Sequence, residues 1–245
     1  MKAFRNPIII LIILLVSLQA TLSLAGLEDF LKGVKKAAGL GEGLSESKIV
    51  EGLKEALQIG TKNAVDKVSN LDGFYKNPGI RIPLPDQVQK AEKALRLVGF
   101  GSQVDAFELS MNRAAEQAAP RAKALFWDAI KQMTFSDARK ILHGADNEAT
   151  LYFKEKTHDQ LGQILRPIIR KSMSQVGVTR SYQDLEARVR TLPFAEALRL
   201  DLDQYVTDKS LSGLFFMLAE EERKIRQDPA ARVTDLLKDV FGSLK

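Results

Sequence analysis

The clearest indication of the fold class is the stretch at residues 45–69, whose sequence is SESKIVEGLKEALQIGTKNAVDKVS. Their apolar side chains recur at intervals of three, four and seven residues, at Val50, Leu53, Leu57, Ala64 and Val68. This spacing places all of them on one face of an α-helix. Ser45 stands just before that helix, where its hydroxyl can accept a backbone N–H as an N-cap. The stretch therefore predicts one long amphipathic helix that is buried along one face.

The same helical period recurs downstream. Pro85 is suited to the first turn of a helix, where the missing N–H of proline costs nothing. An apolar stripe follows at helical spacing, formed by Val88, Ala91, Leu95 and Val98. We expect this whole stripe to be buried.

The last third of the chain is also predicted to be helical. One helix is expected over residues 181–191, and either Asp208 or Ser210 is expected to cap another that ends near Gln227. Residues 229–244 begin with proline and carry a sharply amphipathic pattern, which predicts a final helix.

Two stretches interrupt the helical pattern. Residues 40–44 contain two glycines and predict a flexible link. Residues 77–85 contain three prolines around Ile80-Arg81-Ile82, and proline excludes a helix there. The sequence therefore predicts an all-α, single-domain protein of about nine helices in a non-repeating array, with one short extended Pro-rich segment.

The N-terminus has the three parts of a secretory signal peptide. A positive start at Lys2 and Arg5 precedes the apolar run 8–16, and Ser23-Leu24-Ala25 supplies the small residues of a cleavage site. We predict cleavage after Ala25 and export to the periplasm. An uncleaved membrane anchor is the alternative, although polar residues after position 16 dilute the run that a spanning helix would need.

The predicted organisation is a signal peptide at 1–25, a short amphipathic helix with its glycine-rich link at 26–44, and a helical domain at 45–245. Within the short helix, the apolar side chains of residues 27–38 share one face with lysines beside it. Such a helix can lie on an anionic membrane surface or dock on the body of its own protein. The sequence supports both equally.

Composition excludes several functional classes. The net charge is +5, and the basic residues do not cluster into a stripe, so nucleic acid is not an expected partner. The chain has no cysteine, which excludes disulfides, a thiolate nucleophile and cysteine-bound metals. No phosphate-binding loop or dinucleotide fingerprint occurs, and no cofactor is expected.

Several linked stretches extend from about Ser45 to near the C-terminus. They include Leu53-Lys54-Glu55-Ala56-Leu57, Ile80-Arg81-Ile82-Pro83-Leu84-Pro85, Met111-Asn112-Arg113-Ala114-Ala115-Glu116, Asp203-Gln204-Tyr205-Val206-Thr207 and Gly213-Leu214-Phe215. On these stretches the chain resembles an uncharacterised bacterial family of exported helical proteins, known only as a domain of unknown function. The resemblance implies a helical exported domain and carries no activity or catalytic residues.

Two groups of charged residues lie in apolar settings and are candidates for a ligand site or a structural network. One consists of Arg81, Arg113 and Glu116, and the other of Glu221, Glu222 and Arg226. Arginine has five donors that suit either an anionic ligand or the carbonyls and carboxylates of a loop. Structural tethering is the favoured interpretation for both groups, and Glu222 and Arg226 have the spacing of a helical ion pair.

Candidates for catalysis or metal binding are weak. Asp201, Asp203 and Asp208 suggest a carboxylate site for a cation, but the calcium loop would need glycine and glutamate where Val206 and Ser212 stand. We therefore expect a non-enzymatic binding or envelope-associated protein that takes an unknown protein or small ligand. The alternatives are an unrecognised hydrolase or carboxylate-metal enzyme, and a lipid or membrane-surface binder.

Overall fold

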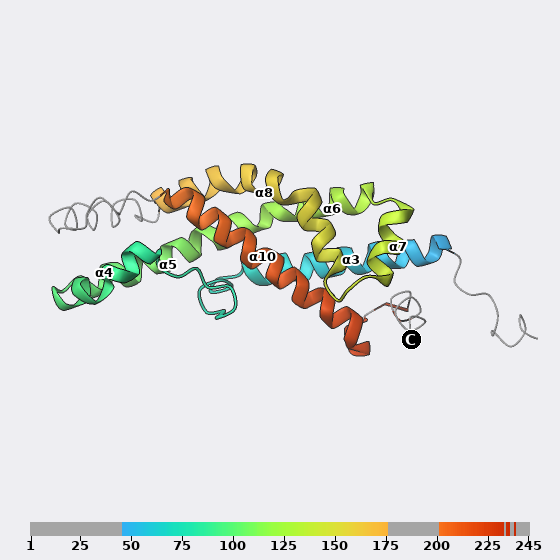
Figure 1. Cartoon of the computed structure of the whole chain (residues 1–245), viewed down its shortest axis with the longest axis horizontal. Helices are drawn as coiled ribbons and strands as arrows, with labels where there is room; N and C mark the ends of the chain where they lie inside the picture. The colour runs from blue at the N-terminus through green and yellow to red at the C-terminus, as the bar shows by residue number, and fades with distance from the viewer. Residues whose placement is uncertain (1–45, 176–200, 233, 236–237, 239–245) are drawn as a thin grey trace, which may run out of the picture. The chain divides into compact units, whose positions relative to one another are not determined.

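The computed structural model describes residues 46–175, 201–232, 234, 235 and 238 (Figure 1). The chain divides into two compact units, Met1–Glu46 and Ser47–Lys245, and the described residues after Glu46 all belong to the second. The predicted signal peptide, the short helix at 27–38 and the link at 40–44 lie outside the described residues.

The described residues form helices, turns and loops, with no β-strand among them, which confirms the predicted all-α class. The α-helices are α3 (Glu46–Ser69), α4 (Asp86–Leu97), α5 (Gly101–Ala118), α6 (Ala122–Gln132), α7 (Phe135–His143), α8 (Glu148–Gln175) and α10 (Leu202–Gln227). Two short 3₁₀ turns, η1 (Ala119–Arg121) and η3 (Pro229–Ala231), accompany them.

The described residues thus contain seven α-helices, fewer than the nine or so that the sequence predicts. The helix expected at 181–191 and most of the one expected at 229–244 lie outside the described residues. Pro120 falls in η1 between α5 and α6, so this proline separates two helices. Pro167 lies inside α8, which continues through it.

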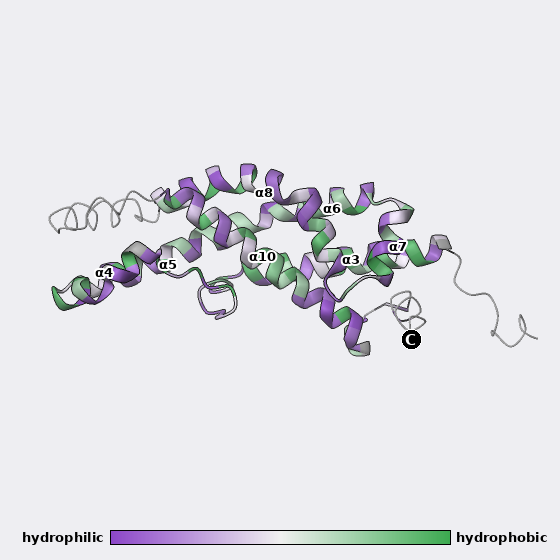
Figure 2. Ribbon diagram, viewed as in Figure 1, coloured by the Kyte–Doolittle hydropathy of each residue, from purple (hydrophilic) through white to green (hydrophobic). Residues whose placement is uncertain are grey.

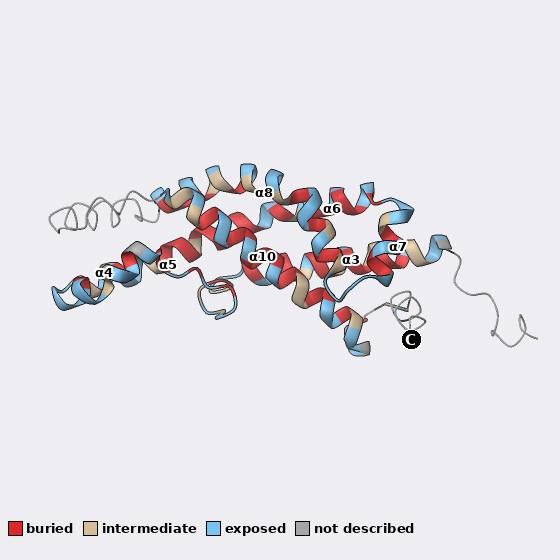
Figure 3. Ribbon diagram, in the orientation of Figure 1, coloured by how far each residue is buried: buried red, intermediate tan, exposed pale blue. Residues whose placement is uncertain are grey.

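Helix α8 is the centre of the packing, since α5, α6, α7 and α10 all contact it. Buried residues line the faces on which these helices meet (Figure 3). Phe126 of α6, Phe153 of α8 and Phe215 of α10 form an edge-to-face cluster, with ring centroids 5.3 and 6.1 Å apart. Such aromatic pairs add to the stabilisation from buried apolar area.

The start of α10 differs from the sequence prediction. The helix begins at Leu202, and Asp201 caps it by accepting the backbone N–H of Gln204 at 3.0 Å. Asp208 and Ser210, the predicted caps, lie inside the helix. A capping side chain is recognised by its position before the first helical turn, and three acidic residues at 201–208 offer competing positions.

The apolar stripe of α4 is buried at Val88 and Leu95, as predicted. Val98 departs from the prediction, because 67% of its surface is exposed. The helix ends at Leu97, so Val98 lies outside it and the helical spacing no longer determines which way its side chain points. After α3, residues 78–80 form a turn, and residues 81–85 adopt neither helix nor strand.

Candidate functional site

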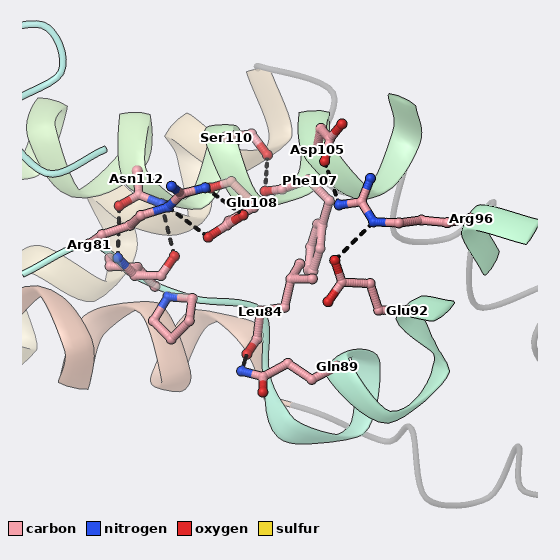
Figure 4. Close-up of polar contacts among 12 residues, drawn as sticks. Arg81, Leu84, Gln89, Glu92, Arg96, Asp105, Phe107, Glu108, Ser110 and Asn112 are labelled. Carbon is pink, nitrogen blue, oxygen red and sulfur yellow. Dashed lines mark hydrogen bonds and ion pairs between the residues drawn. The ribbon is translucent and has the colours of Figure 1, made fainter. Parts of the chain in front are cut away.

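The backbone of the Pro-rich segment is held by a buried side chain of α5. Asn112 is fully buried, and its Oδ1 accepts the N–H of Ile82 at 2.8 Å (Figure 4). Its Nδ2 donates to the carbonyl of Ile82 and to that of Glu108, both at 2.9 Å. Buried backbone N–H and carbonyl groups that lie outside helices and strands need other hydrogen-bond partners. Asn112 supplies them, so its role is structural.

Glu116 lies one helical turn after Asn112 and holds the preceding turn. Its Oε1 accepts the backbone N–H groups of Phe74 and Tyr75 at 3.0 and 3.2 Å. Its Oε2 accepts from Arg113 at 2.6 Å. The residue is buried, and both carboxylate oxygens are occupied by donors of the protein itself. This arrangement is a structural tether.

Arg113 continues the network to Asp72, to whose carboxylate it donates at 2.5 Å. Asp72 has a φ of +68°, in the left-handed region that residues other than glycine rarely adopt. The hydrogen bonds from Lys76 and then Arg113 hold the pKa of Asp72 below its ordinary value. These ion pairs secure a turn whose backbone conformation is unfavourable by itself.

Arg81 does not join the carboxylate of Glu116. It forms a two-point hydrogen bond with Glu108, with both N–O distances 2.8 Å (Figure 4). Its guanidinium carbon also lies 4.5 Å from the centroid of the Tyr75 ring. The pKa of Arg81 is raised, chiefly by the hydrogen bond to Glu108. The charge of Arg81 is thus neutralised within the protein.

Glu222 caps α8 from another helix. Its carboxylate accepts the backbone N–H groups of Ala149 and Thr150 at 2.9 and 2.8 Å, and the Thr150 hydroxyl at 2.9 Å. Arg226 donates to the same carboxylate at 2.9 Å and to the carbonyl of Ile141 at 2.6 Å. The pair therefore joins α10 to the start of α8 and to the end of α7. A carboxylate at a helix N-terminus is also stabilised by the helix dipole.

Glu221, the neighbour of Glu222, serves a different helix. It is buried and accepts from Lys67 of α3 and from Lys224, the latter at 3.1 Å. Burial acts to raise its pKa, but the two lysines outweigh it and the pKa is lowered. Adjacent residues of a helix point about 100° apart, so these two glutamates bind different neighbours.

The three weak metal candidates do not converge on one point. Asp201 accepts from Arg166 at 2.6 Å, and Asp203 pairs with Arg170. Asp208 accepts from a glutamine amide on its own helix at 2.7 Å. The pKa of Asp201 is lowered, first by its backbone hydrogen bond and then by Arg166. Asp201 and Asp203 thus join the start of α10 to α8, and a cation would have to displace two arginines to bind them.

A pocket of about 480 Å³ lies between α6, α7 and α8. None of the charged residues singled out in the sequence lines it. Its lining consists of Leu125, Asp128, Ala129, Gln132, Thr134, Asp137, Tyr152, Lys156, Thr157 and Gln160. Pockets of about 300–1,000 Å³ are typical of small-ligand sites.

Some of the polar side chains that line this pocket form hydrogen bonds within the protein, and others do not. Thr134 and Asp137 form a capping box at the start of α7, and the Tyr152 hydroxyl donates to the carbonyl of Ala129 at 3.0 Å. Burial is the main cause that raises the pKa of Tyr152. The amides of Gln132 and Gln160 form no hydrogen bond with any residue that the structure describes. Two helices thus present free donors and acceptors to one cavity.

A second, smaller pocket of about 330 Å³ lies between α8 and α10. Several of its polar groups have partners: Arg166 binds Asp201, Gln204 binds Asp208, and His158 contacts a neighbouring aspartate at 3.1 Å. The Nε of Arg166, however, is buried and has no hydrogen-bond partner among the described residues. The α6–α8 pocket is larger and is lined by two glutamine amides from different helices, so it is the first candidate for a ligand.

Sequence reasoning missed the lining of the α6–α8 pocket. The two glutamines carry no motif, and the pocket exists only because three consecutive helices fold around it. The capping box at Thr134 and Asp137 was the one local signal, and it places the start of α7.

A family model described as a protein of unknown function (DUF4197) matches residues 43–242 of the chain. The chain belongs to this family. The match spans every described helix and confirms the resemblance drawn from the sequence, and the family's description assigns no activity. No curated protein and no solved structure matches the chain. Within the described ranges, no helix has the length and apolarity needed to cross a bilayer.

Proposed function

We propose that this chain is an exported, non-enzymatic binding protein that takes a small polar ligand in the α6–α8 pocket. The observation that carries the proposal is the pair of free amides, Gln132 and Gln160, in a cavity of about 480 Å³. Lys156 and Asp128 add opposite charges to the same lining. The ligand class is therefore a small molecule with both hydrogen-bond donors and acceptors.

The occupied state of the buried carboxylates favours binding over catalysis. A general base needs a carboxylate oxygen that can reach substrate. The oxygens of Glu116 and Glu222 instead accept backbone N–H groups and arginine, and Glu221 accepts from two lysines. Within the pocket, the Tyr152 hydroxyl already donates to the carbonyl of Ala129, and burial raises its pKa, so it is poorly suited to act as a general base.

Export rests on the sequence alone. The charged start, the apolar run 8–16 and Ser23-Leu24-Ala25 support a cleaved signal peptide and a periplasmic location. N-terminal sequencing of the protein recovered from its own host should begin at Gly26. Recovery of intact Met1 in the fraction released from the periplasm would refute cleavage.

Native mass spectrometry of protein purified from its own host tests the binding function. A bound species of discrete mass, lost on denaturation, is the expected result. A spectrum that shows only the bare polypeptide, even after incubation with periplasmic extract, would contradict the proposal.

A further inference from the structure

The turn that joins α4 and α5 exposes a compact apolar tip. Leu97 is 88% exposed and Val98 is 67% exposed, the highest and third-highest values among the large hydrophobic residues that the structure describes. The end of α4 is green in the hydropathy view and pale blue in the burial view (Figures 2 and 3). Phe100 follows within the same turn and is half-buried. Leu97 and Val98 are adjacent, so they form one continuous exposed apolar surface, which is a candidate interaction site.

The backbone N–H groups that end α4 are satisfied within the helix. Phe100 donates its N–H to the carbonyl of Leu95 at 2.8 Å, and Gly99 donates to that of Arg96 at 3.2 Å. Gly99 has a φ of +88°, which completes a Schellman ending of α4. Val98 also donates its N–H, to the carbonyl of Ala94 at 3.1 Å. Three successive backbone N–H groups therefore need no water, a condition for placing a turn in an apolar medium.

Charge on the same helix face distinguishes the possible partners. Lys90 and Lys93 precede Leu97 by seven and four residues, which puts all three side chains on one face of α4. Both lysines are exposed, and neither forms an ion pair with any residue in the described ranges. Arg96, in contrast, pairs with both Glu92 and Asp105 at 2.9 and 2.6 Å, and these three side chains carry a net charge of −1 (Figure 4). Lys90 and Lys93 outweigh this charge, so the side chains next to the apolar tip are net positive by one charge.

We propose that the α4–α5 tip inserts into the surface of a membrane that contains anionic lipid. Leu97 and Val98 enter the boundary between headgroups and acyl chains, and Lys90 and Lys93 bind the anionic headgroups. This surface is distinct from residues 27–38 and from the α6–α8 pocket, so it stands independently of the proposed ligand.

The dimensions of the helix fit this arrangement. At a rise of about 1.5 Å per residue, Lys93 lies about 6 Å and Lys90 about 10 Å behind Leu97 along the axis. Interfacial segments bury their apolar faces by about 5–10 Å. With the tip inserted to the shallow end of that range, about 5 Å, both ammonium groups reach the headgroup level. The flexible lysine side chains adjust the remaining distance, and the long Arg96 side chain extends back to keep its ion pairs at the same level.

A fluorescent label at the tip tests the proposal, because the chain has no cysteine and an introduced one is unique. Leu97→Cys in the full chain is labelled with an environment-sensitive nitrobenzoxadiazole group. On vesicles of equal parts phosphatidylcholine and phosphatidylglycerol, the label should shift its emission to the blue and lose its quenching by iodide. Leu71→Cys is the matched control, since Leu71 is another leucine, 76% exposed, and lies after α3. Its label should stay accessible to iodide.

The fluorescence of the label at position 97 also tests whether Lys90 and Lys93 contribute to membrane binding. In a Lys90→Glu/Lys93→Glu variant labelled at position 97, affinity for the anionic vesicles should fall at least about tenfold. The proposal is overturned if the label at position 97 stays as accessible to iodide as the label at position 71. It is also overturned if the label responds equally to pure phosphatidylcholine vesicles. Protection of the label at high protein concentration without vesicles would instead assign the tip to a second copy of the chain.

Discussion

The side chain of Asn112 lies against the backbone of Ile82 as a neighbouring strand would, accepting its N–H at 2.8 Å and donating to its carbonyl at 2.9 Å. The Tyr205 hydroxyl of α10 donates to the adjacent carbonyl of Pro83 at 3.0 Å. Burial is the main cause that raises the pKa of Tyr205 to about 12, so this donor persists at every physiological pH. Two helices therefore fix the Pro-rich segment through side chains.

Replacing Asn112 tests how much that contact stabilises the fold. Asn112→Ala leaves the N–H and carbonyl of Ile82 without these partners, and each unsatisfied buried group costs about 1–3 kcal/mol. Urea unfolding should show a loss of about 2–4 kcal/mol. Gln117→Ala, at an exposed position of the same helix, should change stability by less than about 0.5 kcal/mol. Equal stabilities for the two variants would show that Asn112 does not hold the segment.

Gly213 lets the turn after α3 approach α10 closely. A Cβ at this position would lie 2.6 Å from Cε1 of Phe74 and 3.1 Å from Cβ of Ile80, both in buried side chains. Gly213→Ala should therefore lower the melting temperature, although alanine favours a helix by about 1 kcal/mol. Gly162→Ala on α8 meets only Leu211, at 3.9 Å, and should raise the melting temperature. A stabilised Gly213→Ala protein would contradict the close approach.

Glu222 is predicted to stabilise the joint of α7, α8 and α10. Glu222→Gln removes the charge that balances Arg226, whose side chain is only 11% exposed. Breaking such a pair costs about 3–5 kcal/mol. Glu220→Gln, which alters an outer ion pair with Arg223, should cost less than about 1 kcal/mol. The measurement is chemical unfolding of both variants beside the parent protein, and a similar loss in the two would refute the capping role.

Acid should destabilise the protein through Asp72 and Glu221. The folded-state pKa of each lies below its ordinary value of 3.8 or 4.5, so the unfolded chain binds more protons in this range. Their stabilisation is therefore present above the ordinary values and is lost as pH falls through the lowered ones. Melting temperature should stay level from pH 7 to about pH 5 and then fall.

The contribution of Glu221 can be isolated. Glu221→Gln should lower the melting temperature at neutral pH and make its fall in acid shallower. Glu51→Gln, at an exposed position of α3, should leave the acid profile unchanged. An acid profile of Glu221→Gln that runs parallel to that of the parent would refute the assignment.

Helices with a long apolar period were predictable from the sequence, because periodicity reports which face is buried. The stripe on α3 is buried at Leu53, Leu57, Ala64 and Val68. The first and last residues of the helices were less predictable. Val98 continues the period of α4 but lies after its last turn, and Asp201 caps α10 where Asp208 had equal capping chemistry.

The charged networks were only partly predictable. The sequence marks Glu116 and Glu222 as unusual, since carboxylates are costly to bury without partners. It does not reveal that their partners are backbone N–H groups of residues 74, 75, 149 and 150. The α6–α8 pocket depends entirely on the packing of separate helices, so Gln132 and Gln160 had no distinguishing pattern.

The most direct test of ligand binding fills the α6–α8 pocket and leaves the rest of the fold intact. Gln160→Trp places a large ring in the pocket, and Gln163→Trp, three residues along α8, places the same ring at the smaller second pocket. Both glutamines are exposed, so both variants should fold. Native mass spectra of the two proteins, purified from the native host, are then compared. The bound species should disappear with Gln160→Trp and persist with Gln163→Trp. A ligand retained by Gln160→Trp, or no ligand in any of the proteins, would contradict binding in this pocket.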